Sequence, residues 1–168
     1  MNAQKSNIVA LIIALVAPFV VAAIGGITTS SAVSIWYPTL KKPAWNPPAW
    51  IFGPVWTLLY LVMGIASWLV WQKRGQNEAQ VRRALGWYGL QLGLNLGWSL
   101  IFFGWRQVGL ALMEIVALWS ALLMTIVKFG RIRRDAAGLL LPYLLWTTFA
   151  TALNAAIWWL NRQNKPLE

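Results

Sequence analysis

PPAWIFGPVWTLLYLVMGIASWLVW, residues 47–71, is a run without a single charged side chain. A helix needs about 20 consecutive, mainly apolar residues to cross a bilayer. Four further stretches have a similar length and apolarity, at about 7–27, 84–103, 108–129 and 136–160. We therefore predict one all-α integral membrane domain over residues 1–168, built as a bundle of five transmembrane helices.

The composition agrees with a membrane protein and argues against a soluble or nucleic-acid-binding one. The chain is 59% hydrophobic and 11% charged, whereas soluble domains carry about 25% charged residues. The net charge is +10, but the basic residues stand in short clusters that flank the apolar stretches, as in membrane proteins. We therefore expect contacts with membrane lipid and none with nucleic acid.

The first apolar stretch allows two interpretations. Lys5, the apolar run and Ala22-Ala23 resemble a secretory signal peptide. The run is longer than a typical signal core, and no Ala-x-Ala cleavage site follows it. We favour an uncleaved first helix, which tolerates Pro18 when neighbouring helices cover the freed carbonyl.

The connection between the first two stretches, residues 28–46, is predicted to be a long loop. It carries Trp36, Tyr37, Lys41 and Lys42, and aromatic rings such as these are unfavourable when fully exposed to water. Two interpretations stay open: a lid over one end of the bundle, and an interfacial loop anchored by its aromatic side chains.

The basic residues also predict an orientation. Those at the N-terminus and in the connections near 72–83 and 128–135 fall on one side of the membrane and outnumber those on the other. The positive-inside rule then places the N-terminus in the cytoplasm. We expect a multi-pass protein of a bacterial cell membrane, with the outer membrane, where the rule does not apply, as the alternative.

Tryptophan is unusually abundant, with 13 in 168 residues. Tryptophan in membrane proteins normally gathers at the two interfaces. Trp56, Trp119 and Trp146 instead lie well inside apolar stretches. Aromatic faces inside a bundle indicate a cavity for a flat, hydrophobic ligand.

Helical spacing places polar side chains beside some of these rings. Gln91, Asn95 and Trp98 share one face of the third helix at about 100° per residue. Buried amides are costly in a bilayer unless they are paired, so Asn95 and Asn154 should face the bundle interior. They could line a pocket or hydrogen-bond between helices, and one residue can do both.

Two further features of the third and fourth helices allow alternatives. Gly89, Gly93 and Gly97 recur every fourth residue, which lets helices approach closely. We predict a homodimer through this face, with close packing inside one subunit as the alternative. Glu114 is an acid well inside a span and so a functional candidate, with Arg106 as its candidate partner. Its place near the helix start favours a structural or interfacial role.

Three strings carry a family resemblance: KPAWNPP at 42–48, GPVWTLLY at 53–60 and PYLLWTTFATALN at 142–154. Together they resemble the translocator protein family (TSPO), also called tryptophan-rich sensory proteins and formerly peripheral benzodiazepine receptors, including its bacterial members. The resemblance implies a five-helix bundle that often dimerises. It also implies a cavity for porphyrins, sterols and synthetic ligands.

The resemblance implies a membrane tetrapyrrole-binding protein that senses or regulates tetrapyrrole metabolism and stress responses. One alternative is a transporter of porphyrins or other small hydrophobic molecules, although neither an inverted repeat nor paired intramembrane charges are seen. A second is light-dependent porphyrin breakdown with Trp56 and Trp146 as the photochemical residues. Without a triad or nucleotide loop, the sequence argues against other enzymes.

The predicted ligand is porphyrin or haem, with no required cofactor and no metal site. The chain has no histidine or cysteine, so only methionine or tyrosine could ligate iron. Propionates would meet Lys41, Lys42 or Arg106 near the mouth. The tyrosine of a common sterol-binding pattern is missing from residues 153–162, which puts sterol binding in doubt.

Helical faces and the resemblance together give the predicted ligand-binding residues: Trp36, Tyr37, Trp45, Pro47, Pro48, Trp56, Tyr60, Gln91, Asn95, Trp98, Trp119, Trp146, Phe149, Ala150 and Asn154.

Overall fold

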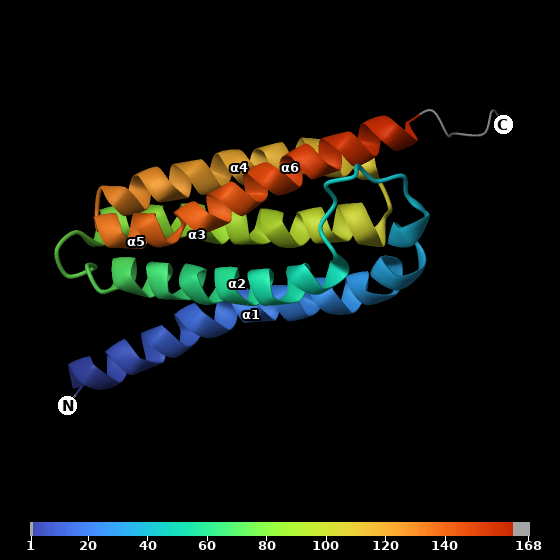
Figure 1. The fold of residues 1–168 in the computed structure, drawn as a ribbon. Coiled ribbons are helices and arrows are strands. Elements are labelled where there is room, and N and C mark those ends of the chain that lie inside the picture. Colours follow the sequence, from blue (N-terminus) through green and yellow to red (C-terminus); the bar gives the residue numbers. More distant parts are fainter. Residues whose placement is uncertain (1, 163–168) are drawn as a thin grey trace.

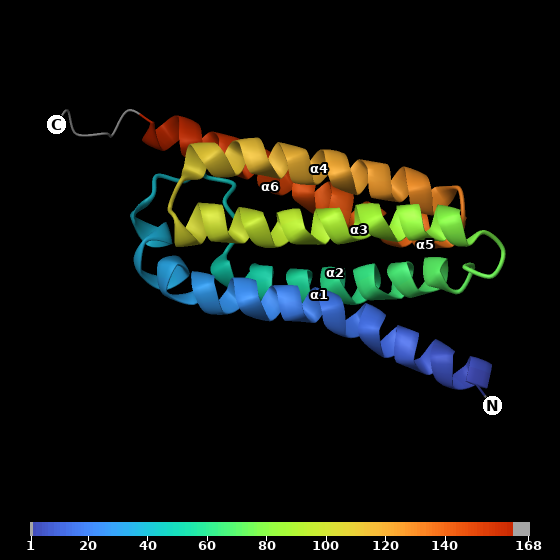
Figure 2. The ribbon, with the colours of Figure 1, turned by 180° about the vertical axis from the view of Figure 1, so that it is seen from behind.

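The computed structural model describes residues 2–162, with side chains described from Asn7 onward, and this part of the chain contains no β-strand. Figures 1 and 2 show long helices running side by side, with α5 and α6 forming one continuous arm. The elements are α1 (Asn2–Ile35), the 3-10 helix η1 (Tyr37–Thr39), α2 (Ala49–Trp71), α3 (Glu78–Ser99), the π-helix η2 (Leu100–Gly104), α4 (Val108–Gly130), α5 (Arg134–Leu139) and α6 (Leu141–Asn161).

Four stretches of the described chain are long and apolar enough to cross a membrane, at Asn7–Ile35, Ala49–Trp71, Val108–Gly130 and Arg134–Asn161. The all-α architecture of a multi-pass membrane protein is therefore confirmed. The predicted span near 84–103 is not among these four, because α3 is the least apolar of the long helices; it packs along α4. It also begins at Glu78, ahead of the predicted residue 84, because the Asn77 side chain caps it by accepting a hydrogen bond from Gln80 N.

The first helix is longer than predicted. It continues to Ile35, so the expectation of a long loop that begins at Thr28 is wrong, and the connection to α2 runs only from Trp36 to Pro48. The polar hydroxyl groups of this stretch are accommodated in the helix, because they donate to carbonyl oxygens three or four residues earlier in the same helix. These donors belong to Thr28, Thr29, Ser30 and Ser34.

The densest core lies at the end of the bundle away from this connection. Met63, Ala66 and Val70 of α2 have no exposed surface, and neither do Ala84 of α3 and Phe129 of α4. These residues belong to one continuous apolar cluster. The filled half leaves any sizeable cavity to the half beneath the α1–α2 connection.

One local feature shapes the half beneath the connection, and another shapes the filled half. The π-helix η2 ends α3 with a hydrogen bond from Trp105 N to Leu100 O, at 2.8 Å. This wider turn carries Phe102 into the interior, where only 2% of it is exposed. In the filled half, next to the buried Met63, α1 and α2 cross so closely that a Cβ at Gly64 would lie 2.8 Å from Ala14 O.

Replacing Gly64 by alanine is expected to destabilise the bundle by about 1–3 kcal/mol, because the new methyl group forces α1 and α2 apart. Thermal unfolding in detergent measures the change. Gly86→Ala on α3 is the matched control, since a Cβ there meets nothing within 4 Å. Equal melting temperatures for the two variants would contradict the close α1–α2 crossing.

Candidate ligand-binding cavity

A cavity of about 800 Å³ lies in the half of the bundle beneath the α1–α2 connection. Its walls come from α1, the connection, the first half of α2, the end of α3 with η2, and the part of α6 from Trp146 to Ile157. Among the described residues, α4 contributes nothing to the lining. The cavity is therefore enclosed by segments that are far apart in sequence, with the connection across its end (Figure 1).

Most of the predicted ligand-binding residues lie together in this lining. They share aromatic, proline or small side chains, with one amide among them. These residues are Tyr37, Pro47, Pro48, Trp56, Tyr60, Trp98, Trp146, Phe149, Ala150 and Asn154.

Five predicted residues lie outside the lining. Trp36 and Trp45 pack behind the wall, edge-on to Phe102 and Phe149 respectively. Gln91 and Asn95 are buried in the bundle. Trp119 donates a hydrogen bond from Nε1 to Thr148 Oγ1 at 2.8 Å, away from the cavity.

The aromatic rings of the wall support one another. Trp56 stacks on Tyr60 with ring centres 5.3 Å apart, and Trp98 stacks on Phe102 at 5.2 Å. Trp146 packs against Phe149, at 5.6 Å. Rings held on two sides lose little further freedom when a flat molecule packs against them, so the wall is preorganised for stacking.

Asn95 joins three helices below the cavity. Tyr60 Oη donates to Asn95 Oδ1 at 2.7 Å, and Asn95 Nδ2 donates to Tyr143 Oη at 2.9 Å. These bonds link α2, α3 and α6, and they pair polar groups that would be costly inside a bilayer. Of the two roles considered for this amide, the structure shows the interhelical one.

Asn154 has both roles. Its side chain lines the cavity, while its Oδ1 accepts a hydrogen bond from Trp98 Nε1 at 3.0 Å. Its Nδ2 donates to Val108 O at 2.9 Å. The amide therefore fixes the position of the Trp98 ring and ties the start of α4 to α6.

The α1–α2 connection is fastened at three points. Lys42 Nζ donates to the carbonyl oxygens of Tyr37, Pro38 and Leu40 at 2.8–3.2 Å, which uses all three of its donors. The amide of Asn161 in α6 exchanges two hydrogen bonds with the backbone of Lys41, at 3.0 and 2.9 Å.

The third fastening is internal to the connection. The Tyr37 hydroxyl donates to Asn46 Oδ1 at 2.7 Å. Burial raises the pKa of the Tyr37 phenol above its ordinary value, so the group stays protonated and keeps this donor at neutral pH. These contacts make the connection an ordered cover over the cavity, which from here on we call the lid (residues 36–48).

The charges near the cavity differ from the sequence expectation. Of Lys41, Lys42 and Arg106, only Lys42 lines the cavity, and its ammonium group already holds the lid together. Arg106 is exposed in the turn before α4, with a φ of 58°. Glu114 forms no ion pair within the described residues, and its Oε1 faces Gly97, 3.4 Å from where a Cβ would stand.

The glycine face of α3 is open in the single chain. A Cβ at Gly89 or Gly93 would meet nothing within 4 Å, and both residues are exposed. Gly97 is the exception, because it packs against Glu114. The proposed homodimer through this face stays a prediction.

Sequence reasoning missed the wall that α1 contributes. Ala22, Gly25, Gly26 and Thr29 line the cavity, together with Phe19. The detectable pattern was small residues at helical spacing, 22, 25, 26 and 29, within an otherwise bulky apolar helix. Their lack of side-chain volume keeps this part of the cavity empty.

The described residues contain no cluster of three or more histidine, cysteine, aspartate or glutamate side chains that could hold a metal ion. The hydroxyl oxygens of Tyr37 and Tyr60 in the wall are potential metal ligands, but both groups already donate hydrogen bonds within the protein. The site thus offers ring faces and apolar surface, with a few amide, hydroxyl and carbonyl groups at its rim.

Comparison with known proteins agrees with the sequence motifs. A family model described as the TspO/MBR family matches residues 14–160. The tryptophan-rich protein TspO of Archaeoglobus fulgidus is 40% identical over 155 residues, covering 92% of this chain and 99% of that protein. The translocator protein of Homo sapiens is 45% identical over 123 residues, 73% of each chain. The tryptophan-rich sensory protein of Cereibacter sphaeroides is 39% identical over 119 residues, 71% of this chain and 72% of that protein.

Replacing Asn95 by leucine is expected to destabilise the bundle by about 1–3 kcal/mol for each tyrosine hydroxyl that loses its partner. Gln91→Leu is the matched control, because that amide is equally buried on α3 and has no hydrogen-bond partner among the described residues. It should be neutral or stabilising. Thermal unfolding in detergent compares the two, and a larger loss for Gln91→Leu would contradict the assigned network.

Proposed function

We propose that this chain, which belongs to the TspO/MBR family, is a membrane sensor or regulator that binds a tetrapyrrole in the cavity beneath the lid. The observation that carries the proposal is a cavity of about 800 Å³ walled by the rings of Trp56, Trp98 and Trp146. Sites for small molecules usually enclose about 300–1,000 Å³ and are mainly apolar with a few placed polar groups.

The character of the wall favours a flat, aromatic ligand. Indole and phenol rings bind a planar π-system through stacking and edge contacts, each worth about 0.5–1.5 kcal/mol beyond area burial. Asn46, Thr57 and Asn154 add polar atoms to the lining. Carboxylates carried on the edge of a porphyrin would be attracted by the positive charge of Lys42 at the lid, whose three donors already bind lid carbonyl oxygens.

The same wall supports binding of the macrocycle and gives no support to iron ligation. It contains no sulfur or imidazole ligand, and its Tyr37 and Tyr60 hydroxyls are engaged within the protein. We therefore propose that metal-free porphyrin and haem bind with similar affinity. No additional cofactor is part of this proposal.

A sensor fits the cavity better than a transporter. The cavity is confined to the lid half, while Met63, Ala66 and Val70 are fully buried in the tight core of the other half. A molecule crossing the membrane would have to separate that core. One relative is named a sensory protein, which agrees with this choice.

Light-dependent porphyrin breakdown remains a second candidate function, favoured by one observation. Trp56 and Trp146 both line the cavity, within reach of any bound macrocycle. Indole rings can donate electrons to an excited porphyrin. Loss of the porphyrin absorption under illumination, abolished by Trp56→Phe or Trp146→Phe and absent in the dark, would establish this activity.

We further propose that the protein lies in a bacterial cell membrane with its N-terminus in the cytoplasm and assembles as a homodimer. The support is the excess of basic residues at the end of the bundle opposite the lid, and the open glycine face of α3. Because the chain has no cysteine, single introduced cysteines at that end and in the lid allow the orientation to be read by labelling in intact cells.

Titration of metal-free protoporphyrin in the dark tests the binding proposal, with the porphyrin absorption as readout. Trp56→Leu and Trp146→Leu are each expected to weaken binding by about two- to tenfold, because each removes one stacking partner. Trp119→Leu is the control, since that ring lies outside the cavity. Saturable binding that ignores the cavity variants, or that depends on Trp119 alone, would contradict the proposed site.

Asn161→Ala is expected to raise the rate of porphyrin dissociation, because it removes both hydrogen bonds that tie Lys41 in the lid to α6. Stopped-flow exchange of bound porphyrin against excess detergent measures the rate. Thr28→Ala is the control, since its hydroxyl bonds only within α1. An unchanged rate in Asn161→Ala would show that the lid does not control ligand release.

A further inference from the structure

A second, polar cavity lies at the end of the bundle away from the lid. It encloses about 260 Å³ between the start of α3 and the end of α4. Its lining is Asn77, Ala79, Gln80, Arg83, Lys128 and Arg131. Three of these six side chains are cations, and no carboxylate belongs to the lining.

The three cations are not neutralised by the protein. Arg83, Lys128 and Arg131 form no hydrogen bond or ion pair through their side chains within the part of the chain that the structure describes. Like charges gathered around one hollow repel one another, and an anion that enters the hollow relieves this repulsion. Cations that only set the orientation of the protein in the membrane do not need to line the same cavity.

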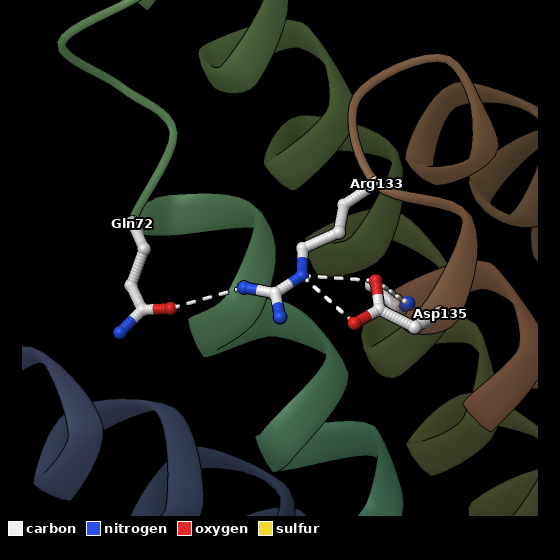
Figure 3. Close-up of polar contacts among 4 residues, drawn as sticks. Gln72, Arg133 and Asp135 are labelled. Atoms are coloured by element: carbon white, nitrogen blue, oxygen red, sulfur yellow. Dashed lines mark hydrogen bonds and ion pairs between the residues drawn. The ribbon is translucent and has the colours of Figure 1, made fainter.

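A neighbouring cation shows the contrast. Arg133 Nε lies 2.9 Å from a carboxylate oxygen of Asp135, and Arg133 Nη1 donates to Gln72 Oε1 at 3.3 Å. Figure 3 shows this guanidinium held between the two side chains. The protein therefore neutralises Arg133 internally and leaves Arg83, Lys128 and Arg131 for an outside partner.

The cavity stands at the level of the membrane surface. Lys128 lies in the last turn of α4, and Arg131 directly follows the membrane-crossing stretch that ends at Gly130. Trp71 ends α2 at the same end, with the Arg74 guanidinium 3.3 Å from the centre of its ring. Tryptophan and arginine in this arrangement are typical of the headgroup region.

We propose that Arg83, Lys128 and Arg131 form a binding site for a phosphate-bearing anion, here the headgroup of an anionic phospholipid. The guanidinium groups match phosphate oxygens in geometry, and the ammonium group adds charge. Gln80 and Asn77 supply neutral polar atoms to the same hollow. Basic cavities between membrane helices hold anionic headgroups in this way.

The test measures lipid binding to the full-length protein in neutral detergent by native mass spectrometry, with phosphatidylglycerol and phosphatidylcholine as probes. One variant carries Arg83→Gln, Lys128→Gln and Arg131→Gln. The matched control carries Lys73→Gln, Arg82→Gln and Arg134→Gln, which remove the same charge at the same end without touching the cavity. Thermal unfolding confirms that both are folded, and the single variant Arg131→Gln, at an exposed position, provides the readout if the triple variant is not.

The cavity variant is expected to lose phosphatidylglycerol binding by about fivefold for each cation removed, while the control changes little and phosphatidylcholine binding stays weak throughout. An equal loss in both triple variants, or none in either, would overturn the site. Inorganic phosphate at millimolar concentration separates the two sources of the anion. If it displaces the lipid from the wild type, the ligand is a soluble phosphate compound; if it does not, the site belongs to the lipid.

Discussion

The hydrogen bonds of one buried amide hold the arrangement on which the cavity depends. Asn95 accepts from Tyr60 and donates to Tyr143, so α2, α3 and α6 are joined at a depth where no water can replace a lost partner. The Tyr60 ring in turn supports Trp56 in the cavity wall. A polar link at this depth fixes the spacing of three helices, which apolar packing alone does only loosely.

One half of the bundle is packed with apolar side chains, and the other half encloses the cavity. Small and medium apolar residues close the half away from the lid, with Ala66, Ala84 and Val70 fully buried. In the lid half, Gly25 and Gly26 of α1 and Gly53 of α2 leave space that large side chains would have filled. The missing volume is tolerated because Asn154, Lys42 and Asn161 tie the surrounding segments together by hydrogen bonds instead of apolar contact.

The features of this structure that could be predicted from the sequence are those that depend on local composition and helical spacing. Uncharged runs mark the helices, and helical spacing relates Trp56 to Tyr60 and Trp146 to Ala150. The end of α1 was not predictable in this way, because Thr28 and Ser34 read as loop residues until their hydroxyls are seen bonded to their own helix. Trp119 illustrates the other limit: its place inside an apolar run does not reveal that α4 contributes nothing to the cavity wall.

The length of α1 couples the cavity to the membrane itself. The helix that contains its apolar stretch runs over 29 residues, Asn7–Ile35, which at about 1.5 Å per residue is about 44 Å, so its polar last turns reach beyond about 30 Å of hydrocarbon. At the opposite end, the N-terminal half of α1 diverges from the bundle (Figures 1 and 2). The residues at its far end, Gly26 and Thr29, are cavity wall. A change in the tilt of α1 within the bilayer would therefore move one wall of the cavity.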